Sequence, residues 1–170
     1  MRSQWKPKGE IEHILAALMP ENRLACEISL RHGLRIGDVL ALPTDKVRKQ
    51  RFTIREQKTG KTRAVRLTVD EVKRCLAFAG QHYVFEHRTN GRQHRTRQAV
   101  FKDLRRVAGA FRVKEHISTH SLRKVYAVEE YRRSGGDLKR VQRLLNHSSE
   151  AVTMLYAMAD IVDRRKNKRR

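Results

Sequence analysis

Gly33-Leu34-Arg35-Ile36-Gly37-Asp38-Val39-Leu40-Ala41-Leu42 is the stretch of sequence around which the rest of the chain can be arranged. Before it, apolar residues recur at helical spacing and predict two helices, over residues 10–18 and 21–31. The glycine that opens the stretch ends the second helix, and a proline after the stretch ends a short third helix over 36–42. Arg35 is therefore expected at the start of that short helix.

The hydrophobic period changes after this stretch. Residues 47–56 and 63–67 are typical of strands, and the turn signal Lys58-Thr59-Gly60-Lys61 lies between them. This pattern predicts a small antiparallel β-sheet near residues 45–68. The remaining helices are expected over residues 70–79, 97–107, 121–134, 137–146 and 150–157. The expected fold class is therefore α+β and mostly helical, with one small sheet.

The charge balance indicates the class of partner. Lys and Arg number 39 against 18 Asp and Glu, which gives a formal net charge of +21. A domain this basic repels itself, and a polyanionic partner offsets that cost. An acidic membrane surface is the competing partner. However, no apolar stretch approaches the roughly 20 residues of a spanning helix, and no signal peptide is evident. We therefore expect nucleic acid as the partner, in the cytoplasm, and no membrane.

The two cysteines, Cys26 and Cys75, are far apart and form no paired metal-ligand spacing. We expect them to be small core residues in a reducing compartment. The sequence also has no tight cluster of Asp and Glu. We therefore expect no metal site and no cofactor.

Several residues at defined spacing have side chains suited to breaking a phosphodiester. They are Arg35, Lys58, His120, Arg123, His147 and Tyr156, with Tyr156 nine residues after His147. Each alone has an ordinary explanation, such as a solvated arginine, a turn lysine, a helix-end histidine or a core tyrosine. Their order, on a chain with a net charge of +21, favours a shared site.

Physical chemistry assigns roles within such a site. Arg35 and Arg123 can donate paired, charge-assisted hydrogen bonds to the non-bridging oxygens of a phosphate. His147 can donate a further hydrogen bond, and His120 can donate one or accept the proton of the nucleophile. A phenol such as Tyr156 needs cationic neighbours to become a good nucleophile, because its unperturbed pKa is about 10.

Four segments carry these residues: Gly33–Leu42, Lys58 in the turn, Thr119–Arg123, and Leu144–His147 followed by Tyr156. In this order, they resemble the boxes of the tyrosine recombinase (phage integrase) family, over roughly residues 10–158. The resemblance implies the catalytic domain of that family, with Tyr156 as nucleophile and Lys58 as the general acid for the 5′-oxygen. It implies a site-specific recombinase that cleaves and rejoins DNA through a covalent 3′-phosphotyrosine, without metal or ATP. Asp38 then orients Arg35 or a neighbouring histidine, or is an ordinary acid at a helix start.

The sequence departs from the family pattern in places. Asn146 replaces the usual glycine, and Lys124 replaces a frequent histidine. Because asparagine tolerates the left-handed conformation that ends helices, we expect the turn at Asn146 to survive.

The family pattern also suggests a domain division. We expect a flexible entry segment over residues 1–9, a catalytic domain over 10–160 and a basic tail over 161–170. No separate N-terminal core-binding domain is expected, so the chain is either a catalytic fragment or a minimal, single-domain member. An accessory or core-binding domain in trans is a partner that either alternative allows. A homo-oligomer on double-stranded DNA is the expected assembly.

The stretch His87–Arg95 is basic and rich in turn residues, so we expect a loop there. Its arginines and the one that follows are expected to contact phosphates without reading sequence: Arg88, Arg92, Arg95 and Arg97. Two alternatives to recombination remain. One is a type IB topoisomerase that relaxes DNA, and the other is a DNA-binding accessory module that does not cleave.

Overall fold

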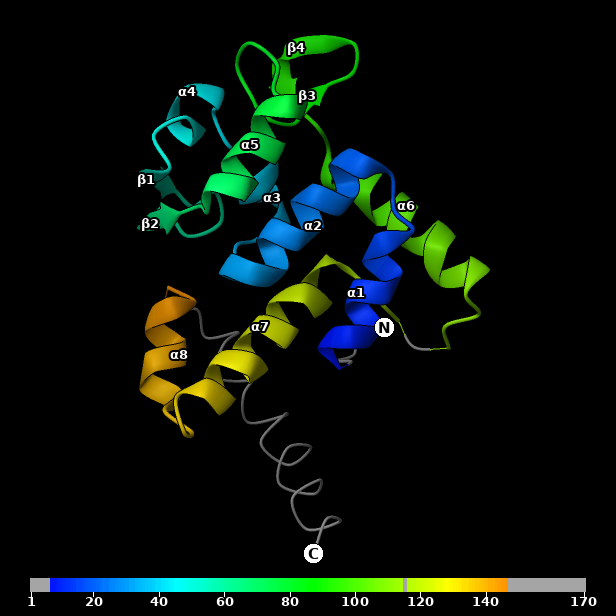
Figure 1. Ribbon diagram of the computed structural model, residues 1–170, viewed down its shortest axis with the longest axis vertical. Coiled ribbons are helices and arrows are strands. Elements are labelled where there is room, and N and C mark those ends of the chain that lie inside the picture. The colour runs from blue at the N-terminus through cyan, green and yellow to red at the C-terminus, as the bar shows by residue number, and fades with distance from the viewer. Residues whose placement is uncertain (1–6, 115, 147–170) are drawn as a thin grey trace, which may run out of the picture.

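The computed structural model describes residues 7–114 and 116–146 of the 170-residue chain. Along the chain the elements are α1 (Lys8–Ala16), α2 (Pro20–His32), α3 (Ile36–Leu40), α4 (Thr44–Val47), β1 (Arg51–Arg55), β2 (Thr62–Arg66), α5 (Val69–Phe78), β3 (Glu86–His87), β4 (Asn90–His94), α6 (Arg97–Ala110), α7 (Thr119–Arg133) and α8 (Leu138–Leu144). Figure 1 shows α2 in the middle of the helices, with the β1–β2 hairpin at the left edge and β3–β4 at the top.

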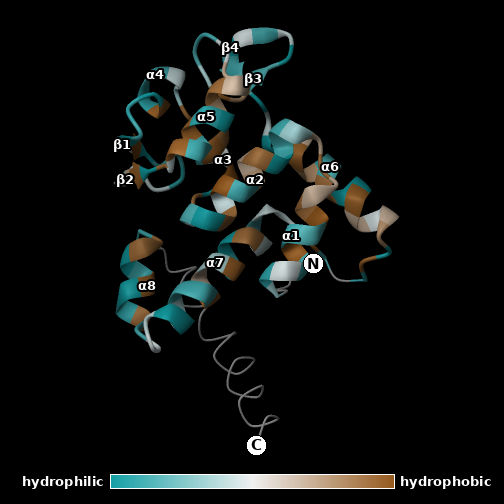
Figure 2. Ribbon diagram, viewed as in Figure 1, coloured by the Kyte–Doolittle hydropathy of each residue, from teal (hydrophilic) through white to brown (hydrophobic). Residues whose placement is uncertain are grey.

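Helix α2 lies at the centre of the core. It contacts α1, α3, α5 and α7, and its Leu24, Ala25, Cys26 and Ile28 are almost fully buried. Along these helices, brown apolar residues alternate with teal hydrophilic ones in Figure 2, and the buried apolar residues form one core cluster. Pro20 starts α2 at a position where no intrahelical N–H is needed. Burial of this apolar surface is the main term that holds the helices together.

The expected sheet is confirmed as the hairpin β1–β2, whose antiparallel register pairs Phe52 with Val65. The loop expected over His87–Arg95 instead forms a second small hairpin, β3–β4. In its two-residue turn, Nδ1 of His87 lies 3.4 Å from the N–H of Thr89 and 3.2 Å from the Thr89 hydroxyl. Local turn chemistry therefore produced a strand pair that has almost no apolar alternation.

The predicted helices in the described part of the chain are confirmed, with ends shifted by a few residues. Helix α1 begins at Lys8, two residues before the expected start, and α7 begins at Thr119 instead of residue 121. The short helix α4 was not predicted. The helix expected over 150–157 and the basic tail lie outside the described residues.

A smaller apolar cluster joins α7 to α8. Ala127, Val141 and Leu145 are fully buried there, with Tyr126 and Tyr131 packed against them. Asp137 caps α8 by accepting a hydrogen bond from the N–H of Arg140 at 2.9 Å. This cluster fixes the end of the described chain near α2 and β2.

The two cysteines are buried and free, as expected for core residues. Burial raises the pKa of Cys75 to about 12 and raises that of Cys26 further. Neither thiol is therefore a nucleophile near neutral pH. Within residues 7–114 and 116–146, no helix has the length and apolar character needed to cross a membrane.

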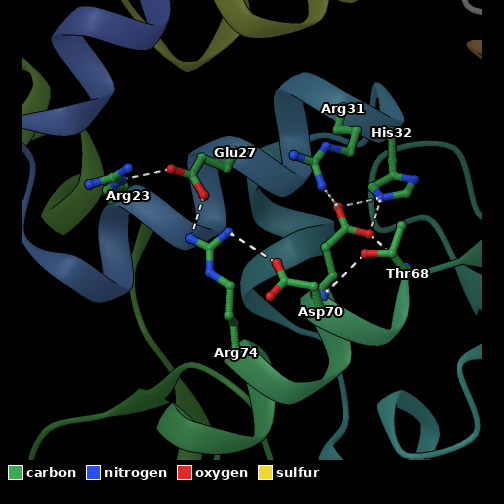
Figure 3. A network of polar contacts seen from close by, with 8 residues as sticks. Arg23, Glu27, Arg31, His32, Thr68, Asp70 and Arg74 are labelled. Atoms are coloured by element: carbon green, nitrogen blue, oxygen red, sulfur yellow. Dashed lines mark hydrogen bonds and ion pairs between the residues drawn. The ribbon is translucent and has the colours of Figure 1, made fainter.

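The buried carboxylate of Glu71 ties the C-terminal end of α2 to the start of α5 through Arg31, His32 and Thr68, which Figure 3 labels. Glu71 accepts a hydrogen bond from the N–H of Thr68 at 2.8 Å, and its oxygens lie 3.0 Å from both Arg31 and His32. Burial alone would raise the pKa of Glu71, but the contacts with His32 and Thr68 and the charge of Arg31 together lower it to about 2. Glu71 therefore stays ionised and links the two helices.

Glu71→Gln tests this link through its pH dependence. Because the folded pKa lies below the ordinary value of 4.5, the carboxylate stabilises the fold above about pH 4.5 and ceases to do so as pH falls toward 2. Urea unfolding should show the stability advantage of wild type over Glu71→Gln shrinking by about 3 kcal/mol across that window. Asp70→Asn, at the exposed neighbouring acid, is the charge-matched control. A constant difference between wild type and Glu71→Gln would contradict the assignment.

Candidate active site

The site begins where α2 ends. Gly33 has a φ of +63°, the left-handed conformation that stops the helix. A Cβ atom at this position would lie 2.3 Å from the ring of Tyr126 on α7. Two independent constraints therefore require glycine here.

The last carbonyls of α2 hold two arginines that arrive from other elements. Arg63 on β2 donates to the carbonyl of His32 at 2.6 Å and to that of Gly33 at 3.3 Å. The Gly33 carbonyl also accepts a hydrogen bond from Nη1 of Arg123 on α7. Unsatisfied carbonyls at a helix C-terminus attract cations, so this end of α2 suits both guanidinium groups.

Arg123 is 3% exposed and lies near the start of α7. Ser118 caps this helix by accepting a hydrogen bond from the N–H of His120, and the Ser121 hydroxyl accepts one from the N–H of Ser118. Burial, together with the nearby charges of Arg35 and Arg63, lowers the pKa of Arg123 to about 10. The guanidinium remains charged at neutral pH.

Arg35 lies at the N-cap position of α3, as expected from the sequence. Its Nη1 donates to Oε2 of the buried Glu56 at 2.7 Å. Its Nε and Nη2 are buried without a hydrogen-bond partner among the described residues. These two donors share one edge of the guanidinium and form the fork that binds phosphate or carboxylate in a bidentate manner.

Asp38, on the first turn of α3, supports the neighbouring hairpin. Its Oδ1 accepts a hydrogen bond from the N–H of Gln57 at 2.9 Å, and its Oδ2 is buried without a partner in the described part of the chain. Burial raises the pKa of Asp38, with Glu56 adding to the rise, although the Gln57 bond and the charges of Arg35 and Arg123 oppose it. Asp38 therefore contacts the hairpin backbone rather than Arg35 directly.

A cavity of about 450 Å³ opens between α3, the β1–β2 hairpin and the starts of α6 and α7. Its ionisable lining residues are Arg35, Asp38, Lys58, Arg97, His120 and Arg123. The structure thus brings together four residues that sequence motifs selected from distant segments. His147 and Tyr156 lie outside the described residues.

Arg97 was expected to contact DNA from the basic loop, but it lines this cavity at the first position of α6. Gln57 lines it as well. No motif pointed to Gln57, although its position next to Lys58 was a usable signal. Arg88 and Arg92 are exposed on the β3–β4 hairpin, while Arg95 is half-buried at its base.

A second cavity, of about 390 Å³ between α1, α2 and α7, differs in its charge. Its arginines are matched by carboxylates, as in the pairs Arg23–Glu27 at 2.7 Å and Arg74–Glu27 at 2.5 Å (Figure 3). The Arg35–Arg123 cavity is lined by four Lys and Arg side chains and one carboxylate. Basic side chains therefore outnumber carboxylates by a wider margin in the lining of this cavity than in that of the other.

The turn at Asn146 has the expected conformation. Asn146 follows α8 with a φ of +60°, so asparagine adopts the left-handed turn for which glycine is usual. Within residues 7–114 and 116–146, no group of three His, Cys, Asp or Glu side chains is placed to hold a metal ion.

The sequence profile of the phage integrase family matches residues 5–161. The chain belongs to this family. Among its relatives, the probable integrase/recombinase YoeC of Bacillus subtilis is 32% identical over 137 residues, which cover 77% of this chain and 74% of that protein. The integrase of Escherichia phage P2 is 30% identical over 148 residues, covering 87% of this chain and 41% of that one.

The tyrosine recombinase XerD of Rhizobium meliloti is 29% identical over 141 residues, covering 76% of this chain and 44% of XerD. The family member described here thus spans less than half of the P2 integrase and of XerD. The expected family is confirmed. Because its relatives are integrases and tyrosine recombinases, the topoisomerase-like and accessory-module alternatives are not favoured.

Solved structures confirm the expected fold. The catalytic domain of bacteriophage HP1 integrase superposes with a TM-score of 0.66 at 19% identity, covering 92% of this chain and 88% of that one. A lambda integrase dimer bound to a COC′ core site gives a TM-score of 0.71 at 20% identity, covering 91% and 48%. This integrase-family chain therefore has the tyrosine recombinase catalytic fold.

Gly33→Ala tests the dependence of the site on the end of α2. The substitution places a Cβ against Tyr126 and strains a left-handed residue, so we expect a loss of about 2–4 kcal/mol in the free energy of unfolding. Gly109→Ala is the control, because a Cβ there meets nothing within 4 Å. In α6 it should instead stabilise by about 0.5–1 kcal/mol. Equal stabilities for the two variants would contradict the account.

Proposed function

We propose that this chain cleaves and rejoins DNA strands as a site-specific recombinase, through a covalent 3′-phosphotyrosine at Tyr156. The observation that carries the proposal is the cavity in which Arg35, Lys58, His120 and Arg123 meet. Family membership supports the same reaction.

The electrostatics of the cavity suit a phosphodiester. The nearby charges of Arg35 and Arg63 contribute to the lowered pKa of Arg123, so the three guanidinium groups repel one another. An anion between Arg35 and Arg123 would relieve that repulsion and satisfy the unpartnered Nε and Nη2 of Arg35. As charge builds on the non-bridging oxygens in the transition state, these donors gain strength, and each contributes a few kcal/mol where water is excluded.

The remaining groups move protons and form the new bond. The Tyr156 oxygen attacks phosphorus, and His120 accepts its proton or donates to the phosphate. The bond to the 5′-oxygen breaks, and Lys58 protonates that leaving oxygen. His147 donates a further hydrogen bond to the phosphate. The phosphotyrosine conserves the bond energy, so the reverse attack by a 5′-hydroxyl reseals the strand without ATP.

Double-stranded DNA in the cytoplasm is the proposed substrate, and a homo-oligomer on DNA is the proposed assembly. Structures with the same fold include XerH bound to its difH substrate and a lambda integrase tetramer bound to a Holliday junction. The net charge of +21 supports binding to such a polyanion.

Lys58→Ala tests the proton donor. Loss of a general acid should slow cleavage about 10²–10⁴-fold on ordinary DNA. A substrate with sulfur in place of the bridging 5′-oxygen has a much less basic leaving group, so it should restore the variant to within about tenfold of wild type. Covalent adduct formation on denaturing gels measures both rates.

Arg123→Ala is the control for the Lys58 experiment. It removes transition-state hydrogen bonds and should slow cleavage about 10²–10³-fold on both substrates. If sulfur restored both variants or neither, the assignment of Lys58 as the general acid would be wrong.

The β3–β4 hairpin is proposed to contact the DNA backbone. For Arg88→Ala/Arg92→Ala, the slope of log binding constant against log salt should fall by about one unit for each phosphate that an arginine no longer neutralises. Fluorescence anisotropy with a labelled duplex measures that slope. Arg105→Ala/Arg112→Ala removes two exposed charges from the far part of α6 and its end, and should change the slope less. Equal slopes for the two double variants would place the hairpin off the DNA.

A further inference from the structure

Glu56, at the end of the first strand of the β1–β2 hairpin, is a buried carboxylate that the family motifs do not include. Its side chain is fully inaccessible to solvent. Oε2 accepts hydrogen bonds from Arg35 at 2.7 Å and from the Thr59 hydroxyl at 2.8 Å, while Oε1 lies 3.5 Å from Nη1 of Arg63. One side chain thus contacts a proposed phosphate ligand and the turn that carries Lys58.

The backbone of Glu56 closes the same turn. Its N–H donates to the carbonyl of Lys61 at 2.9 Å, and its carbonyl accepts from the N–H of Gly60 at 2.8 Å. Lys58 lies within the segment, residues 56–61, that these two hydrogen bonds close. The turn is therefore fixed to Glu56 through both its main chain and its Thr59 side chain.

The charge of Glu56 is maintained despite burial. Burial alone would raise its pKa, but the hydrogen bond from Thr59 and the charge and hydrogen bond of Arg35 together lower it. A buried carboxylate of this kind restricts its partners strongly, because moving any of them leaves an uncompensated charge. Arg35 and the turn are therefore both held in place by the Glu56 carboxylate.

We propose that Glu56 is a positioning residue that holds the Arg35 guanidinium and the Lys58 turn as one unit, so that the phosphate ligand and the proton donor keep a fixed separation. The inference rests on the proposed strand cleavage. By engaging Nη1, Glu56 leaves the Nε–Nη2 edge of Arg35 for the phosphate. It acts through Arg35 and Lys58 and does not touch the DNA.

This role predicts a split between binding and cleavage. Glu56→Gln removes a negative charge behind the cavity, so DNA binding should stay within threefold of wild type or become tighter. Cleavage should fall about 100-fold, the size of effect that displacement of a reacting group by about 1 Å produces. A residue with only a structural role would lower binding, cleavage and stability together.

Glu27→Gln is the matched control. Glu27 also pairs with two arginines, Arg23 at 2.7 Å and Arg74 at 2.5 Å, but it lines the other cavity. The experiment compares wild type and both variants in duplex binding, in adduct formation on nicked DNA, and in hydrogen exchange of the Gly60 N–H and the Arg35 Nε–H. We expect slower cleavage and at least tenfold faster exchange in Glu56→Gln only.

Equal cleavage rates and equal hydrogen-exchange rates in Glu56→Gln and Glu27→Gln would overturn the inference. If wild type forms no adduct, strand cleavage itself fails, and exchange at Gly60 and Arg35 still decides whether Glu56 holds both groups. If Glu56→Gln does not fold, Thr59→Val decides in its place, because it removes one hydrogen bond to the carboxylate and keeps the charge. Thr59→Val should speed exchange of the Gly60 N–H and slow cleavage about tenfold. If both the exchange rate and the cleavage rate stayed at the wild-type values, the proposal would be refuted.

Discussion

The hydrogen bonds accepted at the C-terminal end of α2 are the constraint on which the site depends. The Gly33 carbonyl accepts from both Arg63 and Arg123, and the positive φ of Gly33 ends the helix so that this carbonyl is available. Tyr126 packs where any other side chain would begin. The core around α2 thus positions the guanidinium groups of Arg63 and Arg123. Arg35 follows Gly33 by two residues and lies at the N-cap position of α3.

Charge compensation separates the site from the rest of this basic chain. Around Glu27 and Glu71, arginines pair with carboxylates, and those pairs join α2 to α5 (Figure 3). At the site, Glu56 takes one edge of Arg35 and leaves the other without a partner in the described chain. Such donors are costly when unsatisfied and therefore favour an anionic ligand.

Much of the fold and site could be predicted from sequence, because helical periodicity, the hairpin turn and motif order are local signals. Four motif residues do meet in one cavity, from Arg35 to Arg123. Glu56 could not be found in this way, since its role comes from burial and from partners on other elements. Arg97 was grouped with the DNA-binding loop by its position in the sequence. Its place beside α3 results from tertiary packing, which no local pattern reveals. The β3–β4 hairpin was missed because its residues lack the apolar alternation that marks a strand.

The most direct test of the account is covalent capture of DNA by the chain. Wild type and Tyr156→Phe would be incubated with a pool of nicked duplexes that trap the cleaved strand, and resolved on a denaturing gel. We expect a protein–DNA adduct in wild type that is absent from Tyr156→Phe, while both proteins bind DNA equally. An adduct that persists in Tyr156→Phe, or none in wild type despite tight binding, would contradict it.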